Sequence, residues 1–277
     1  MLRRRPAAPL RGLVDDYSGY ALHGLPLTMH RGLPSRWLTV VLAIDEPLEL
    51  AAMPDPRQPP GVFQAAFGGL HSSPARIRMD THHTGIHLAL TPRGARTLFG
   101  VTAGELGSRV VHLDEVVGRS GGELLERVHA ESTWPRRFEA LDGVLLSWLR
   151  DRPKQARPEV VWAWDRLVAD GGAPRVQDLA DDVGWSRRHL NQRFRDEFGL
   201  PPKVAARVVR FERARRMFEE DPRASLARVA VSSGYSDQAH LTREWQALAG
   251  CSPARWLREE FPYFQDWTDV EEPESSA

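Results

Sequence analysis

Side chains that could read the edges of DNA bases form two groups in the C-terminal half of the sequence. The first group is Arg187, Arg188, Asn191, Gln192 and Arg195, and the second is Gln238, Ala239, Thr242, Arg243 and Gln246. Arginine pairs with guanine O6 and N7, asparagine and glutamine pair with adenine, and alanine or a threonine methyl packs on the thymine methyl. These residue types predict hydrogen bonding to bases rather than catalysis.

The apolar residues between them predict that each group lies on the outer face of a helix. Leu190, Phe194 and Phe198 repeat at helical spacing in the first segment, and Leu241 and Trp245 do so in the second. At about 100° per residue, the faces opposite these apolar side chains carry Arg188, Asn191, Gln192 and Arg195 in the first helix and Ala239, Thr242, Arg243 and Gln246 in the second. Gln238 lies at the exposed N-terminal turn of the second helix. The alternative for each residue is a solvated side chain or a phosphate contact, an alternative strongest for Arg195 and Gln246.

The surrounding charge fits a polyanionic partner. The chain of 277 residues has 37 basic and 37 acidic residues, yet Arg187 to Arg216 holds ten Arg or Lys against Asp196, Glu197 and Glu212. Such a basic stripe suits DNA, while a solvated helix face with salt bridges is the alternative. Arg207 and Arg210 in this stripe are expected to contact phosphate or to be solvated.

A repeated unit predicts how the two polar groups are positioned. Asp178–Ser186 and Ala227–Ser236 each contain an apolar helical segment, a glycine, an aromatic residue and a serine. The glycine allows a tight turn with positive φ, the aromatic side chain fills the angle between two helices, and the serine caps the second helix. The expected caps are Ser186 and Ser236. This is the pattern of a helix-turn-helix unit, present twice.

Residues 176–259 resemble the DNA-binding domain of the AraC/XylS family of bacterial transcription regulators. The stretch Ala230 to Trp256, including Gly250-Cys251-Ser252-Pro253, matches the family signature. The resemblance implies a rigid central helix, here 203–220, and two recognition helices that enter major grooves about 34 Å apart. It also implies base contacts at the matching positions, which are Arg188, Asn191, Gln192, Gln238, Thr242 and Arg243.

The N-terminal half has a different pattern. Short apolar or alternating runs at 37–44, 62–67, 75–79 and 85–90 predict strands, and apolar spacing over 121–149 predicts two amphipathic helices. The expected fold class is α+β: a mixed, mainly β N-terminal domain followed by an all-α double helix-turn-helix domain. The family resemblance implies a cupin-like barrel that senses an effector or mediates dimerisation.

The composition places the expected domain boundaries. Residues 1–150 are expected to form the sensory or dimerisation domain, the charged and proline-containing segment 151–158 the linker, and 159–261 the DNA-binding domain. Residues 262–277 contain five acidic and no basic residues, and they are expected to form a disordered tail.

An enzyme is the alternative function. Asp80, His82, His83 and His87 have the residue types of a two-His, one-carboxylate metal site, so a metal-dependent cupin-type enzyme carrying a DNA-binding module is the second hypothesis. On a strand, however, His83 and His87 share one face and His82 lies on the other. Ordinary histidines at a strand end are the preferred interpretation, with no metal and no cofactor.

The remaining expectations concern partners and location. Double-stranded DNA is the expected partner, with RNA polymerase, a small-molecule effector and a second copy of the chain as further candidates. The longest apolar run, 38–44, is shorter than the roughly 20 residues needed to span a bilayer, and no signal sequence is apparent. The single cysteine, Cys251, excludes an internal disulfide. We therefore expect a cytoplasmic protein without a membrane partner.

Overall fold

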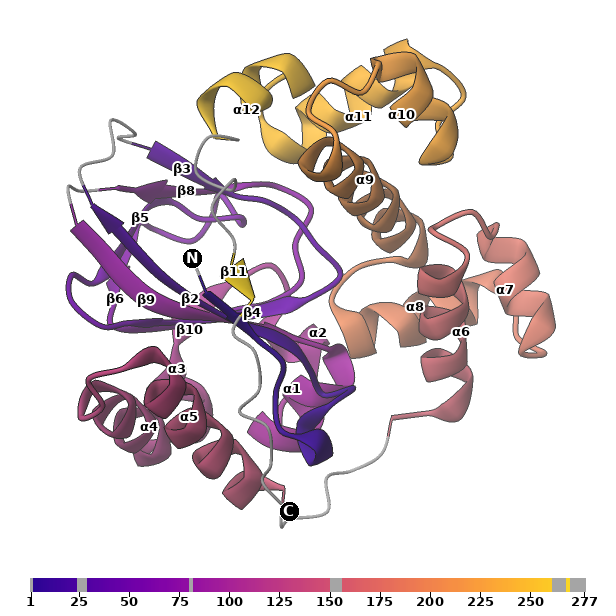
Figure 1. The fold of residues 1–277 in the computed structure, drawn as a ribbon. Helices are drawn as coiled ribbons and strands as arrows, with labels where there is room; N and C mark the ends of the chain where they lie inside the picture. The colour runs from indigo at the N-terminus through magenta and orange to yellow at the C-terminus, as the bar shows by residue number, and fades with distance from the viewer. Residues whose placement is uncertain (1, 24–28, 80–81, 150–155, 261–267, 270–277) are drawn as a thin grey trace, which may run out of the picture.

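The computed structural model describes residues 2–23, 29–79, 82–149, 156–260 and 268–269 (Figure 1). A β-rich N-terminal part and an all-helical C-terminal part lie side by side, which confirms the predicted α+β class. The predicted linker 151–158 lies mostly outside the described residues, and α6 begins within it at Pro158.

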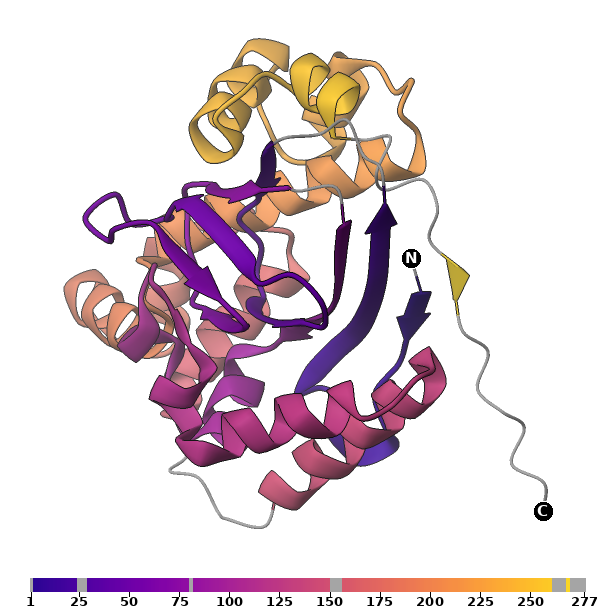
Figure 2. The ribbon, with the colours of Figure 1, turned by 90° about the vertical axis from the view of Figure 1, so that its left-hand side faces the viewer.

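The N-terminal part contains two sheets (Figures 1 and 2). The larger sheet has the order β10-β7-β4-β9-β2-β1-β11, with strands β1 (Leu2–Arg4), β2 (Val14–His23), β4 (Leu38–Ala43), β7 (Ala65–Gly68), β9 (His82–Leu90), β10 (Val110–His112) and β11 (Thr268–Asp269). The smaller sheet has the order β3-β8-β5-β6, with strands β3 (Met29–Gly32), β5 (Leu48–Ala52), β6 (Gly61–Phe63) and β8 (Ala75–Arg78). The strand runs predicted at 37–44, 75–79 and 85–90 each overlap one of these strands, whereas the run predicted at 62–67 covers parts of two strands, β6 and β7, in different sheets.

Alternation along the central strands builds the interior of the larger sheet. Val40 pairs with Leu88 and Leu42 with Ile86 in the antiparallel register of β4 and β9, and these four side chains are fully buried. Because side chains alternate between the two faces of a strand, this register puts all four on one apolar face. Tyr17 of β2, opposite Leu88, lies on the same face and packs against the helix Trp134–Trp148.

The described residues of the N-terminal part also form the 3-10 helix η1 (Ala8–Leu10) and five α-helices: α1 (Pro92–Phe99), α2 (Ala103–Leu106), α3 (Leu113–Val117), α4 (Arg119–His129) and α5 (Trp134–Trp148). The apolar spacing predicted α4 and α5, whereas the three shorter helices α1–α3 were not predicted. Helix α5 packs against β2, where Phe138 stacks on Tyr17 with ring centroids 6.0 Å apart. The buried Asp142 of α5 accepts a hydrogen bond of 2.9 Å from the Tyr17 hydroxyl.

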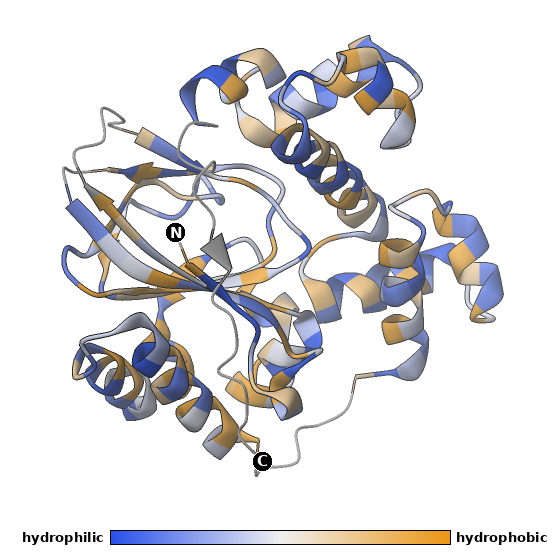
Figure 3. Cartoon of the chain, viewed as in Figure 1, coloured by the Kyte–Doolittle hydropathy of each residue, from blue (hydrophilic) through white to orange (hydrophobic). Residues whose placement is uncertain are grey.

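The C-terminal part consists of seven helices: α6 (Pro158–Ala169), α7 (Val176–Asp182), α8 (Arg187–Phe198), α9 (Pro202–Glu220), α10 (Leu226–Ser232), α11 (Gln238–Ala249) and α12 (Pro253–Glu259). Hydrophobic and hydrophilic residues alternate along them in Figure 3, as expected for helices that bury one face. Among the described residues, no helix is long and apolar enough to cross a membrane.

The two parts share one continuous cluster of buried apolar side chains that reaches from Leu10 to Trp256. The backbones of the two parts approach closely between α2 and α8: a Cβ atom added at Gly104 would lie 2.0 Å from the Asp196 carbonyl oxygen. Only a glycine permits this backbone contact. In the acidic tail, which the sequence predicts to be disordered, Thr268–Asp269 pairs in parallel with β1, and residues 261–267 and 270–277 lie outside the described residues.

Candidate nucleic-acid interface

The first helix-turn-helix unit has the geometry that its sequence predicts. Gly184 has φ +69°, and the Trp185 N–H donates back to the Ala180 carbonyl at 2.8 Å, so the chain turns sharply between α7 and α8. The Ser186 hydroxyl then accepts from the His189 N–H at 3.2 Å and caps α8. Leu190 and Phe194 are fully buried, which fixes the rotation of α8 about its axis.

The second unit repeats this turn but begins its second helix one residue later. Gly234 has φ +80°, and the Tyr235 N–H donates to the Ala230 carbonyl at 2.9 Å. The cap of α11 is Asp237, whose carboxylate accepts from the His240 N–H at 2.6 Å. The prediction that Ser236 caps this helix is therefore wrong.

Ser236 supports the cap instead. Its hydroxyl donates to the Asp237 carboxylate at 3.0 Å. The hydrogen bonds from the His240 N–H and the Ser236 hydroxyl lower the pKa of Asp237. A charged carboxylate at this position also interacts favourably with the positive end of the α11 dipole. This extra residue shows that Ser186 corresponds to Asp237, although the sequence repeat aligns Ser186 with Ser236.

The two serines should therefore respond differently to substitution. Ser186→Ala removes an N-cap and should lower the free energy of unfolding by about 1 kcal/mol, whereas Ser236→Ala leaves the cap in place and should cost less than half as much. Urea denaturation of both variants measures the difference. Equal losses would mean that Ser236 contributes to capping as much as Ser186 does.

Eight of the ten candidate residues lie on the outward faces of α8 and α11, and the other two, Arg187 and Gln238, lie at the first turns of these helices. Arg187, Arg188, Gln192, Arg195, Gln238, Ala239, Arg243 and Gln246 are exposed, while Asn191 and Thr242 are half-buried. Most of the polar ones have no long-range partner. Their hydrogen bonds stay within one helical turn, for example Gln192 Nε2 to Asp196 at 2.7 Å and Thr242 Oγ1 to the Gln238 carbonyl at 2.9 Å. The faces are thus free to exchange these local bonds for base or phosphate contacts.

Helix α9 lies between the two units and contacts both sides. Arg207 donates to Glu244 of α11 at 2.6 Å, and Arg210 donates to the Gly172 carbonyl before α7 at 2.6 Å. Neither arginine is the simply solvated residue considered from the sequence. Each instead joins the connecting helix to one helix-turn-helix unit, in addition to the ring contacts of Trp245 with Phe211 and Phe218.

The histidines considered for a metal site do not converge in the described residues. Among these, no group of three or more His, Cys, Asp or Glu side chains could hold a metal ion, and Asp80 lies outside them. On β9, His83 is buried and His82 is exposed on the opposite face. Burial, followed by the charge of Arg215, lowers the pKa of His87 to about 4. His87 is therefore neutral at pH 7 and packs as part of the strand.

Sequence reasoning missed several charged residues that connect the two parts of the chain. Arg31, Arg36 and Arg96 of the N-terminal part form ion pairs with Glu260, Glu212 and Glu197, respectively. No spacing along the chain signals these pairs, because their members lie more than a hundred residues apart. They become apparent only when the two parts are packed together.

Comparison with known proteins agrees with this geometry. Residues 179–259 match a family model described as a helix-turn-helix domain. The Msm operon regulatory protein of Streptococcus mutans is 30% identical over 89 residues, which are 32% of this chain and 32% of that protein. The probable thc operon regulatory protein of Rhodococcus erythropolis is 27% identical over 194 residues, 59% of this chain and 58% of that protein. The chain thus spans less than two thirds of these curated relatives.

A solved structure shows the same overall fold. ToxT from Vibrio cholerae aligns with a TM-score of 0.53 and 10% identity over 88% of this chain and 97% of that chain. A second structure of ToxT, described as bound to an unsaturated fatty acid, aligns with a TM-score of 0.53 and 10% identity over 92% of this chain and 96% of that chain. The arrangement of a β-rich part beside two helix-turn-helix units is therefore found in a known protein.

Proposed function

We propose that this chain, whose C-terminal region is a helix-turn-helix domain of the AraC type, is a sequence-specific DNA-binding transcription regulator. One observation carries the proposal: two capped helices, α8 and α11, present exposed polar faces and are fastened to one rigid helix, α9. Exposed Arg, Asn, Gln and Thr side chains on helices of this size suit the major groove, which admits one α-helix. The named relatives are described as operon regulatory proteins, which supports the same function.

The proposed base contacts are the ten candidate residues of α8 and α11, with Arg188, Asn191, Gln192, Gln238, Thr242 and Arg243 as the principal ones. We propose residues 1–150 as the sensory or dimerisation domain and 159–261 as the DNA-binding domain. The fatty acid described in a ToxT structure supports a small-molecule effector for this chain as well. RNA polymerase and a second copy of the chain are the other proposed partners. The metal-dependent enzyme receives no support from the described histidines or from the relatives.

Selection from a random duplex library tests the proposal. The purified full-length chain should enrich a sequence long enough to present two successive major grooves on one face, or roughly two turns of DNA. Recovery of no preferred sequence would contradict sequence-specific binding. The enriched duplex then serves as the probe for the variants described below.

Base reading by the two helices can be separated from phosphate contact. Arg188→Ala or Arg243→Ala should weaken binding to the enriched duplex by about 1–3 kcal/mol and relax the preference at one or two base pairs, because a bidentate guanine contact is lost. Titrations with the enriched and a scrambled duplex at one salt concentration measure both effects. Arg166→Ala, on the exposed side of α6, is the matched control and should change neither affinity. Equal weakening on both duplexes would assign Arg188 and Arg243 to the phosphate backbone.

A further inference from the structure

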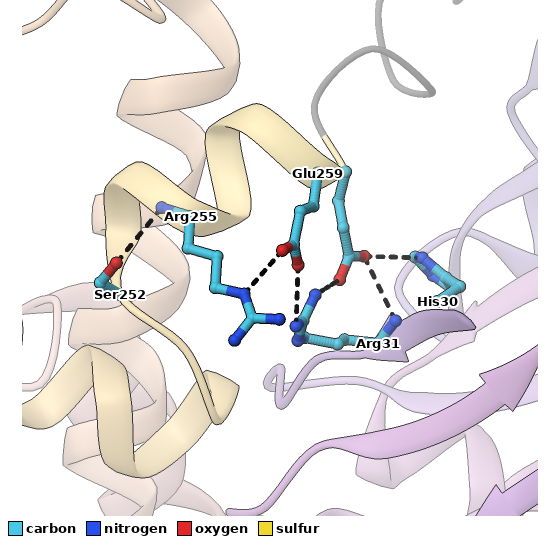
Figure 4. Close-up of polar contacts among 6 residues, drawn as sticks. His30, Arg31, Ser252, Arg255 and Glu259 are labelled. Atoms are coloured by element: carbon cyan, nitrogen blue, oxygen red, sulfur yellow. Dashed lines mark hydrogen bonds and ion pairs between the residues drawn. The ribbon is translucent and has the colours of Figure 1, made fainter. Parts of the chain in front are cut away.

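Four polar side chains join the N-terminal part to the end of the second helix-turn-helix unit (Figure 4). We call His30 and Arg31 of β3, with Glu259 and Glu260 at the end of α12, the interdomain latch. Arg31 Nη1 lies 2.6 Å from Glu260 Oε1, and Arg31 Nη2 lies 3.0 Å from Glu259 Oε2. The Arg31 backbone N–H donates to Glu260 Oε2 at 3.2 Å, and His30 Nδ1 lies 2.7 Å from the same oxygen.

The centre of the latch is buried. The side chain of Arg31 is 4% exposed and that of Glu260 is 0% exposed. Removing two charges from water is costly, and the cost is recovered only when the pair is well aligned and its other polar atoms are bonded. Here the guanidinium contacts two carboxylates through Nη1 and Nη2, and the Glu260 carboxylate receives three contacts. Arg31 Nε is the exception, being buried without a hydrogen-bond partner among the described residues. A displacement of α12 would leave buried charges unpaired, so the latch strongly favours a single position of α12.

The contacts of Glu260 with His30 and Arg31 also determine its protonation state. Burial alone would raise the pKa of this carboxyl, but the hydrogen bond and charge of His30, together with the contacts from Arg31, lower it overall. The carboxylate is therefore ionised at neutral pH and can accept all three contacts. The latch is a charged contact under ordinary conditions.

Helix α12 transmits this position to the second recognition helix. Trp256 of α12 is fully buried, and its ring lies 5.5 Å from that of Trp245 in α11. Trp245 in turn contacts Phe211 of α9 at 4.8 Å. Close-packed side chains leave little room for relative movement. A shift of α12 on β3 would thus disturb the packing of α11, whose outer face carries Gln238 and Arg243.

The first unit is attached to the N-terminal part by separate contacts. Arg96 of α1 pairs with Glu197 of α8 at 2.6 Å, and α2 approaches α8 closely at Gly104. Arg36 pairs with Glu212 of α9, its backbone N–H donating at 3.0 Å. The N-terminal part therefore holds each unit and the helix between them independently. Among the described residues, the latch supplies the ion pairs that join the N-terminal part to the second unit.

We propose that the interdomain latch positions the second recognition helix and so determines which separation of two DNA half-sites the protein prefers. The inference rests on the proposed function, since it requires that both recognition helices contact DNA. Arg31, Glu259 and Glu260 are positioning residues in this proposal and do not touch DNA. One added base pair rotates the second half-site by about 35° and moves it along the axis, so a rigid pair of helices must discriminate against it.

The test measures half-site spacing with the full-length chain. The enriched duplex is remade with one or two base pairs inserted or deleted between its two half-sites, and the affinity for each duplex is compared with that for the original. For the wild-type chain, one added base pair should weaken binding roughly tenfold, as for a mismatch in a site. For Arg31→Met and Glu260→Gln, the same insertion should weaken binding no more than about threefold, because α12 is released.

Controls separate positioning from a general loss of structure. The readout is a ratio of two affinities of one protein sample, so a partly unfolded fraction cancels. Arg31→Lys keeps a charge that can pair with one carboxylate, and its ratio should lie between those of Arg31→Met and the wild type. Arg258→Ala, exposed on the same helix and outside the latch, should retain the wild-type ratio. If circular dichroism shows Glu260→Gln to be unfolded, Glu259→Gln tests the latch, with Arg255→Gln as its control because Glu259 also pairs with Arg255 of the same helix at 2.6 Å.

The outcomes are distinct. If the wild-type chain enriches no sequence, the proposed function fails. If it enriches a sequence but tolerates insertions equally well, or if the latch variants keep the wild-type ratio, DNA binding stands and the latch proposal is wrong. A flattened spacing profile in the latch variants, with the wild-type profile in Arg258→Ala, supports it.

Discussion

Trp245→Ala should lower the free energy of unfolding by about 3–5 kcal/mol, the range for removal of a large aromatic side chain from a core. Trp245 is fully buried and contacts three other rings: Phe211 at 4.8 Å, and Phe218 and Trp256 at 5.5 Å. The cavity would open where α9, α11 and α12 meet. Denaturant unfolding followed by circular dichroism gives the free energy.

Two variants make this measurement specific. Trp162→Ala removes a tryptophan that is 40% exposed on α6 and should change the free energy of unfolding by less than about 1 kcal/mol. Trp245→Phe should cost much less than Trp245→Ala, because Nε1 of Trp245 has no hydrogen-bond partner among the described residues and phenylalanine removes that buried donor. A loss for Trp245→Ala as small as that for Trp162→Ala would mean that the second unit does not depend on this aromatic cluster.

DNA binding should weaken by about a hundredfold between 50 and 200 mM salt, if each of the four exposed arginines of the recognition helices neutralises one phosphate charge, whether its guanidinium hydrogen-bonds to a base or to the backbone. These arginines are Arg187, Arg188, Arg195 and Arg243, and none has an acidic partner among the described residues. Counterion release gives a slope of about −0.9 per contact in a plot of log affinity against log salt, hence about −3.6 in total. Titrations at four or more salt concentrations measure it.

Substitution of single arginines tests how many of them neutralise phosphate charges. Arg195→Gln should reduce the magnitude of the slope by about 0.9 if this residue contacts phosphate. Arg215→Gln is the control, because Arg215 pairs with Glu219 on α9 and should leave the slope unchanged. A slope near zero for the wild-type chain would contradict an electrostatic contribution from these helices.

The sequence predicted the DNA-binding part well because its elements are set by local signals. Apolar spacing, glycines at positive φ and hydroxyl or carboxylate caps act within a few residues, so α7–α11 could be placed from the repeat. The repeat was found by aligning Ser186 with Ser236. That alignment hid the extra residue in the second turn, so the sequence did not predict Asp237 as the cap.

Features that depend on packing between distant residues could not be predicted. The sequence shows no relation between Arg31 and Glu260, and Gly104 has no local signal that marks it as the point where α2 meets α8. The helices α1–α3 lie outside the repeat, which is the signal that placed helices of similar length such as α7 and α10. The order of the strands in two sheets also depends on long-range pairing, which a single sequence does not reveal.

The cap correspondence between Ser186 and Asp237 has a consequence for the DNA. Counted from these caps, matched positions of the two helices differ in every pair of candidate residues: Arg187 with Gln238, Arg188 with Ala239, Asn191 with Thr242, Gln192 with Arg243, and Arg195 with Gln246. Two different faces favour two different half-sites, so a site for one molecule should have no internal symmetry. We expect each bound molecule to have a defined polarity along the duplex, with its β-rich part on a fixed side, and inversion of a site should reverse that orientation relative to the neighbouring gene.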